Sequence, residues 1–86
     1  MVNTAGQIET IQAIYDAISS HGVPDSEELD LLDGEGNNLG RCLSMIGLIV
    51  TAEKNTGKPV WLSRDSGEHI CSLRFQGENQ YEITPV

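Results

Sequence analysis

The hydrophobic pattern of the chain changes its period once, after Lys58, and this change limits the fold to a mixed class. Before that residue, apolar side chains recur at intervals of three and four, which is typical of amphipathic helices. After it, apolar and polar residues alternate, as they do in strands with one buried face. We therefore expect helices first and a sheet last, in a single domain that spans residues 1–86.

The first element is expected to be an amphipathic helix from Ala5 to His21. Its apolar stripe consists of Ile8, Ile11, Ile14, Tyr15 and Ile18. Thr4 and Gln7 have the three-residue spacing of a capping box at the start of this helix. Gly22 can adopt the left-handed conformation that ends many helices, and Pro24 follows it closely.

The segment after this helix permits two interpretations. Asp25 and Glu28 again have the spacing of a capping box, and acids in a first turn complement the helix dipole. This favours a short helical turn from Ser26 to Leu32. The alternative makes Glu28 to Asp33 a strand, after which the chain turns at Gly34 to Gly36 and returns through Leu39.

A longer helix is expected from Leu39 to Asn55, with Asn38 as its cap. Its main apolar stripe consists of Leu39, Cys42, Leu43, Ile46, Ile49 and Val50. On the opposite side, Gly40, Ser44 and Gly47 are small enough to let another backbone approach closely. This seam would pack either within the core, against the first helix, or against a second copy of the chain in a homodimer.

Three short strands are expected after the helices, in an antiparallel meander. They span Pro59 to Arg64, Glu68 to Phe75 and Gln80 to Thr84, with turn-forming residues between them. In the middle strand, one face is expected to carry His69, Cys71, Leu73 and Phe75. The predicted fold is therefore α+β: two amphipathic helices plus a short helical turn, packed on a three-stranded antiparallel β-meander, in the order α-(α)-α-β-β-β.

Charge is distributed very unevenly along the chain. Thirteen acids and five bases give a net charge of -8, and no Lys or Arg occurs before Arg41. Six of the acids form one stretch without a base, which we call the acidic stretch: Asp25, Glu27, Glu28, Asp30, Asp33 and Glu35. Such a surface repels nucleic-acid phosphates and anionic membranes and attracts basic protein surfaces. We expect these residues to bind a protein partner with a basic surface, with no direct binding to nucleic acid or membranes. The alternative is that the acids only keep the protein soluble.

The glycine-rich loop after Leu29 can be considered as a cofactor site and as a calcium site, but the sequence does not support either. The segment from Leu29 to Gly40 resembles the first motif of nucleotide-fold methyltransferases, but the chain lacks the further strand and helix units of that parallel sheet. Asp33 begins an alternation of oxygen donors like that of a calcium loop. Such a loop needs a glycine sixth and a glutamate twelfth, where this chain has Asn38 and Ser44. Neither a cofactor nor calcium is therefore expected.

The remaining candidates for chemistry are His21, His69, Cys42 and Cys71, which lack the paired spacing of structural zinc sites. His69 and Cys71 lie two residues apart, yet no third catalytic group or oxyanion loop accompanies them. No metal ligand, cofactor or catalytic residue is expected, and the chain is predicted not to be an enzyme. The lack of a signal peptide and of a membrane span indicates a cytoplasmic protein with packed thiols, with a single disulfide between Cys42 and Cys71 as the alternative.

The element order from Ala5 to Phe75 resembles that of the winged-helix DNA-binding family. The resemblance implies that Leu39 to Asn55 is a recognition helix and that the turn from Asp65 to Glu68 is the tip of the wing. The chemistry departs from that family, because the helix offers only Arg41 and Lys54 as bases. If the topology holds, this surface is expected to bind protein instead.

These observations predict a small non-enzymatic regulatory or inhibitory module that binds a protein partner through its acidic N-terminal half. In a more specific form, the carboxylates of the acidic stretch imitate DNA phosphates and block a nucleic-acid-binding protein, as inhibitors of phages or mobile elements do. The alternative is a structural or adaptor subunit that assembles through the long helix and the sheet face, with incidental acidity.

Overall fold

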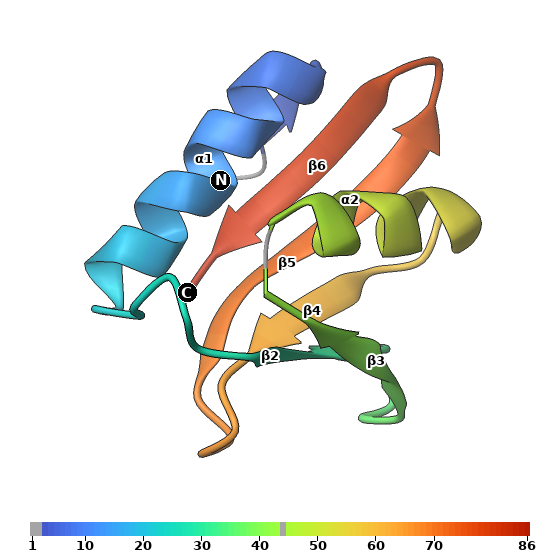
Figure 1. Ribbon diagram of the computed structural model, residues 1–86. Helices are drawn as coiled ribbons and strands as arrows, with labels where there is room; N and C mark the ends of the chain where they lie inside the picture. Colours follow the sequence, from blue (N-terminus) through green and yellow to red (C-terminus); the bar gives the residue numbers. More distant parts are fainter. Residues whose placement is uncertain (1–2, 44) are drawn as a thin grey trace.

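Two helices cover one face of an antiparallel sheet in the computed structural model, which describes residues 3–43 and 45–86 (Figure 1). The helices are α1, Gln7–Ser20, and α2, Met45–Lys54. The strands are β1, Asn3–Ala5; β2, Leu29–Leu32; β3, Asn38–Cys42; β4, Val60–Ser63; β5, His69–Gly77; and β6, Gln80–Pro85. In the described part of the chain, no helix has the length and apolarity needed to cross a membrane.

The sheet has the strand order β1-β6-β5-β4-β2-β3, in which β2 lies beside β4 although β3 and α2 separate them in the chain. β4, β5 and β6 follow one another as hairpins. β2 and β3 form another hairpin, and α2 then returns the chain to β4 on the other side of β2. The result is a five-stranded antiparallel sheet, β6-β5-β4-β2-β3, to which the short β1 adds a sixth strand beside β6.

The expected α+β class, the first helix and the three C-terminal strands are confirmed. α1 begins at Gln7, and the capping interaction predicted for Thr4 is wrong because Thr4 lies in β1. Instead, the backbone N–H of Gly6 donates a 2.8 Å hydrogen bond to the carboxylate of Glu9. Gly22 has a φ of 68°, the left-handed conformation expected at the end of this helix.

The short helical turn expected from Ser26 to Leu32 is wrong, because Leu29–Leu32 forms strand β2. Leu29 and Leu31 are each 3% exposed, and the residues between and after them face the other side of the sheet. β2 pairs with β3 on one side and with β4 on the other, so its backbone polar groups are satisfied within the sheet. The chain thus adopts the alternative hairpin interpretation.

The helix expected from Leu39 to Asn55 is wrong in its first part, because Asn38–Cys42 forms strand β3 and α2 begins only at Met45. Gly40 provides a physical reason, since its φ of 146° lies far from helical values in a region that favours glycine. Asn38 is not a helix cap, and its side-chain oxygen accepts a 2.8 Å hydrogen bond from the N–H of Gly40. The apolar residues that have helical spacing from Leu39 onward therefore belong to two elements, β3 and α2.

The β2–β3 hairpin also corrects the topology. The predicted three-stranded meander is wrong as a description of the whole sheet, because the hairpin pairs with the edge of β4 that a meander would leave open. After β1, the elements follow the order α-β-β-α-β-β-β, and the order α-(α)-α-β-β-β is replaced. The order of a winged helix, in which a helix occupies the place of β3, does not apply either.

A bulge in β5 changes which of its residues share a face. In the pairing with β4, Ile70 is an extra residue between His69 and Cys71. Ile70 and Cys71 are both fully buried. The ring of His69 instead lies 5.2 Å from that of Trp61, whose chain neighbours both point into the core. The expectation that His69 shares a face with Cys71 is thus wrong, and the bulge is the reason.

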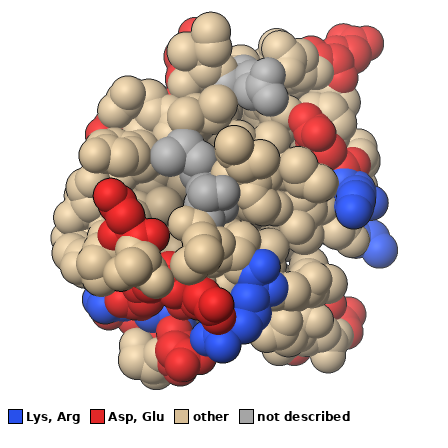
Figure 2. All heavy atoms as spheres, viewed as in Figure 1, with Lys and Arg blue, Asp and Glu red and all other residues tan. Residues whose placement is uncertain are grey.

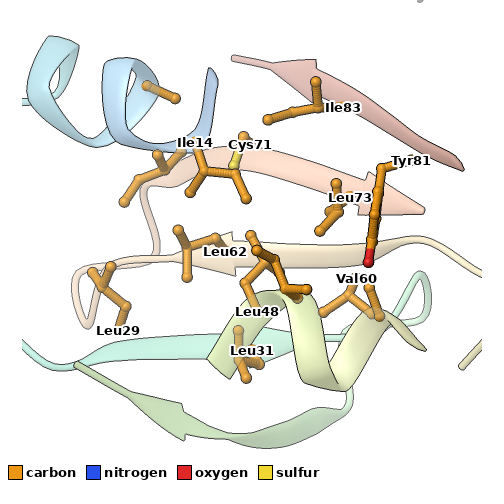
Figure 3. Close-up of a cluster of buried hydrophobic side chains, with 14 of the residues drawn as sticks. Ile14, Leu29, Leu31, Leu48, Val60, Leu62, Cys71, Leu73, Tyr81 and Ile83 are labelled. Carbon is orange, nitrogen blue, oxygen red and sulfur yellow. The ribbon is translucent and has the colours of Figure 1, made fainter. Parts of the chain in front are cut away.

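The core fills the space between the sheet and the two helices (Figure 3). Ile14 of α1 and Leu48 of α2 are fully buried and pack over strand residues such as Leu62. The hydroxyl of Tyr81 donates a 2.5 Å hydrogen bond to the carboxylate of Glu53, which ties the end of α2 to β6. Burial, and then this hydrogen bond, raise the pKa of Tyr81 to about 12.

Candidate functional site

The residues of the acidic stretch are distributed over three local structures. Asp25, Glu27 and Glu28 lie in the connection between α1 and β2, Asp30 lies in β2, and Asp33 and Glu35 lie in the turn between β2 and β3. Two arginines from later in the chain, Arg41 and Arg64, fold back against this stretch. The charges are therefore less segregated in space than in sequence.

Arg64 forms a bidentate ion pair with Glu27. Its Nε and Nη2 atoms each donate a 2.8 Å hydrogen bond to an oxygen of the Glu27 carboxylate. Its Nη1 atom donates a 3.2 Å hydrogen bond to the carbonyl of His21 at the end of α1. The hydrogen bonds from Arg64 lower the pKa of Glu27 below its ordinary value. This ion pair thus links the connection after α1 to Arg64, which directly follows β4.

The same network extends to the imidazole of His21. Its Nδ1 atom pairs with the carboxylate of Glu68, and its Nε2 atom lies 3.2 Å from the carbonyl oxygen of Val86. Glu68 also lies 3.7 Å from Arg64. The hydrogen bond with Glu68, and then that with Val86, raise the pKa of His21. His21 and Arg64 therefore join the end of α1, the turn after β4 and the end of β6.

Arg41 of β3 contacts three carboxylates. Its guanidinium lies 3.0 Å from Asp30, 2.7 Å from Asp65 and 3.4 Å from Glu28. Glu28 and Arg41 are about half-exposed, so solvent screens this last and longest contact. Asp30 is held across the β2–β3 hairpin, whereas Glu28 stays accessible.

Asp33 organises the turn between β2 and β3. Its Oδ1 atom accepts 2.8 Å hydrogen bonds from the N–H groups of Glu35 and Asn37, and its Oδ2 atom accepts one of 3.0 Å from the Asn37 side chain. The Asn37 side chain contributes most to the lowered pKa of Asp33. By contrast, Asp25 and Glu35 are exposed, and neither forms an ion pair within residues 3–43 and 45–86.

The predicted seam of small residues is not a continuous helical stripe. Gly40 lies in β3, Gly47 lies in α2, and Ser44 lies outside the described residues. Gly47 does allow a close approach, because a β-carbon at this position would lie 2.5 Å from the β-carbon of Cys42. In this chain, the missing side chain of Gly47 lets α2 pack on β3.

An apolar depression that the sequence analysis did not predict lies between α1 and the segment before α2. It has a volume of about 250 Å³, and its lining consists of Tyr15, Ile18, Ser19, Val23, Pro24, Asp25, Glu27, Leu29 and Leu43. A second depression of about 290 Å³ adjoins it at Leu43 and is also lined by Glu28, Arg41 and Cys42. We call these two depressions, which share Leu43, the helix-side groove.

The signal for this groove was present in the sequence as an excess of apolar residues. The segment from Leu39 to Val50 carries more large apolar side chains than one buried side of a helix needs. In the structure Leu48 and Ile49 are buried, while Leu43 and Ile46 are 59% and 63% exposed. Because the apolar stripe expected for the long helix contains Leu43 and Ile46 together with the buried Ile49, spacing alone does not distinguish the exposed residues.

The residues considered for catalysis and metal binding are not brought together. Cys71 is a buried thiol on the helix side of β5 and forms no disulfide with Cys42. Burial raises the pKa of Cys71 to about 12. His69, on the other face, lies 2.6 Å from the buried hydroxyl of Ser63. Among the described residues, no group of three or more His, Cys, Asp or Glu side chains could hold a metal ion.

Figure 2 shows the face of the molecule that carries both helices. Uncharged surface occupies most of its middle, and acidic side chains lie at its borders, with basic ones beside them below and to the right. Comparisons of the chain with protein-family models, with curated proteins and with solved structures found no match.

Proposed function

We propose that this protein is a small cytoplasmic, non-enzymatic regulatory or inhibitory module that binds a protein partner with a basic surface through its acidic N-terminal half. The observation that carries the proposal is the combination of an open apolar groove with accessible carboxylates at its edge, namely Asp25 and Glu28. Protein interfaces commonly combine an apolar centre with a charged rim. No Lys or Arg lies on α1 to oppose a basic partner.

In a more specific form of the proposal, the partner is a nucleic-acid-binding protein, and the carboxylates occupy its phosphate-binding groove. A net charge of -8 on 86 residues supports this form, because it matches the sign of the phosphates that such a groove attracts. Competition by short duplex DNA for the captured partner tests this form separately from the general proposal.

The experiment reverses the accessible charges and leaves the paired ones intact. Glu27 and Asp30 are unsuitable, since Lys at either position would meet Arg64 or Arg41 and unsettle the fold. The double variant Asp25→Lys, Glu28→Lys should therefore be compared with wild type for capture of partners from the native host and for the salt dependence of binding.

A matched control for this experiment is the triple variant Ser66→Lys, Glu78→Lys, Gln80→Lys. These three residues are exposed and lie outside the groove and outside α1, and replacing them changes the net charge by the same amount as the double variant. We expect the first variant to lose the partner and the control to keep it. Equal capture by both variants would remove the acidic surface from the proposal and leave only a solubility role.

A second candidate function is that of a structural or adaptor subunit, and it has its own observation. β3 is an edge strand of the sheet, and the exposed Ile46 and Val50 of the adjoining α2 could pack against another subunit. Light scattering of the purified protein over a range of concentrations tests this function. A monomer at every concentration contradicts self-assembly and leaves only a sister chain as partner.

A further inference from the structure

The helix-side groove combines exposed apolar side chains from α1 and from the segment before α2. Tyr15 of α1 and Leu43, before α2, are 52% and 59% exposed and line the same depression. Ile46 and Val50 of α2, which do not line either depression, are also exposed, by 63% and 43%. Contiguous apolar surface of this kind is characteristic of binding sites, whereas isolated exposed apolar residues are ordinary.

The charges around the groove have one predominant sign. Asp25 and Glu27 line its first depression, and Glu28 lines the second. α1 carries no basic residue, and the base on α2 is Lys54 in its last turn. Arg41, at the far edge, already contacts three carboxylates.

We propose that the helix-side groove binds an amphipathic basic helix, whose apolar side chains pack against Leu43 and whose lysines or arginines contact Asp25 and Glu28. The inference rests on the proposed function and names the partner's secondary structure and the place where it binds. Apolar grooves take helices through side chains spaced three and four residues apart. The acidic rim is complementary to the polar face of a basic helix.

Charge also distinguishes this occupant from a second copy of the chain. Each copy carries a net charge of -8, and two such copies would bring Asp25 and Glu28 of both chains toward the same groove. Like charges brought together at an interface oppose association. A basic helix instead neutralises these carboxylates as it covers the apolar surface.

A defined peptide can serve as the probe. We would use a fluorescently labelled helix of leucine and lysine about 18 residues long, which gives about five turns, with the leucines on one side. A peptide of the same composition in scrambled order, which has the charge but no apolar side, is the control ligand. Fluorescence anisotropy is expected to show saturable binding of the amphipathic peptide, weakened by salt, and at least about tenfold weaker binding of the scrambled one.

Variants of the protein locate the binding. Leu43→Ser should weaken binding of the amphipathic peptide about tenfold, because it removes the apolar side chain that lines both depressions. Ile8→Ser is the matched control, since Ile8 is 83% exposed on α1 and does not line the groove, and it should leave binding unchanged. Circular dichroism checks that each variant folds, and Tyr15→Ser, at another exposed residue that lines the groove, replaces Leu43→Ser if the latter does not fold.

The outcomes separate this inference from the proposed function. If Leu43→Ser and Tyr15→Ser bind the peptide as wild type does, while the variant Asp25→Lys, Glu28→Lys still loses its partner, the groove inference is overturned and the acidic surface stands. If the groove variants lose the peptide but charge reversal does not release the partner, the proposed function fails instead. Equal binding of the scrambled peptide, or a dimer that Leu43→Ser dissociates, also overturns the inference.

Discussion

Glu27 and Arg64 are joined by two hydrogen bonds of 2.8 Å, one to each oxygen of the carboxylate, and this pair connects the acidic stretch to the end of β4. The hydrogen bonds hold the pKa of Glu27 below its ordinary value of 4.5. When folding lowers the pKa of a carboxyl group, that group stabilises the fold at pH values above its pKa in the unfolded chain. This stabilisation disappears as the pH falls through its pKa in the folded chain.

Replacing this carboxylate therefore has an effect that depends on pH. Glu27→Gln should lower the midpoint of thermal unfolding at pH 7, and the difference from wild type should shrink as the pH falls below 4.5. Glu35→Gln, at an exposed acid without an ion pair in the described residues, is the control and should behave as wild type. A Glu27→Gln difference that persists undiminished in acid would contradict the role of the ion pair.

His21 should produce the opposite pH dependence. Its pKa is raised above 6.5, first by the hydrogen bond with Glu68 and then by that with the Val86 carbonyl. The stabilisation by His21 is complete at pH values below its pKa in the unfolded chain. It is lost as the pH rises through its pKa in the folded chain. Thermal unfolding between pH 6 and pH 9 should show a fall in midpoint for wild type and a flatter profile for His21→Ala. Parallel profiles would show that the imidazole does not hold the helix end.

Gly47→Ala should destabilise the protein, although alanine is normally the better helix residue by up to about 1 kcal/mol. A β-carbon at Gly47 would lie 2.5 Å from that of Cys42, and such overpacking costs about 1–3 kcal/mol. Denaturant unfolding of a double-mutant cycle isolates this contact. The penalty should persist in a Cys42→Ala background, which keeps the β-carbon, and fall in a Cys42→Gly background. A penalty that is unchanged in the Cys42→Gly background would show that the cost arises from another contact.

Asp33 should act on the β2–β3 hairpin and not on partner binding. Its carboxylate accepts hydrogen bonds from the N–H groups of Glu35 and Asn37, so Asp33→Ala should increase amide hydrogen exchange in β2 and β3. Asp33→Asn keeps one acceptor and should have a smaller effect. The neighbouring Glu35→Ala is the control and should leave exchange unchanged. Loss of partner binding without faster exchange would make Asp33 a binding residue instead.

The parts of the fold that could be predicted depend on contacts near in sequence. The alternation from Val60 to Thr84 and the turn residues within it identify three strands because each strand pairs with the next. For β2, the capping-box spacing of Asp25 and Glu28 favours a helical turn over the alternative strand. For β3, Leu39, Cys42 and Ile46 also satisfy helical spacing. What decides between helix and strand is Gly40 with its φ of 146° and the pairing of β2 with β4, a contact between distant residues.

The candidate site shows the same limit. The acids of Asp25 to Glu35 could be found by counting, but their partners could not, because Arg41 and Arg64 reach them only through the pairing of β2 with its two neighbours. The helix-side groove was hidden for a related reason. Apolar residues such as Leu43 and Tyr15 look like core residues until the packing shows that they are more than half-exposed.

The position of β2 between β3 and β4 has a consequence for the order in which the chain folds. Hairpins between consecutive strands close short loops, whereas pairing β2 with β4 must close the much longer loop that contains β3 and α2. We expect the β4-β5-β6 hairpins to form early and the β2–β3 hairpin to dock late. Until it docks, Glu27 is not beside Arg64, and a newly made chain presents its acids without the arginine that later holds one of them.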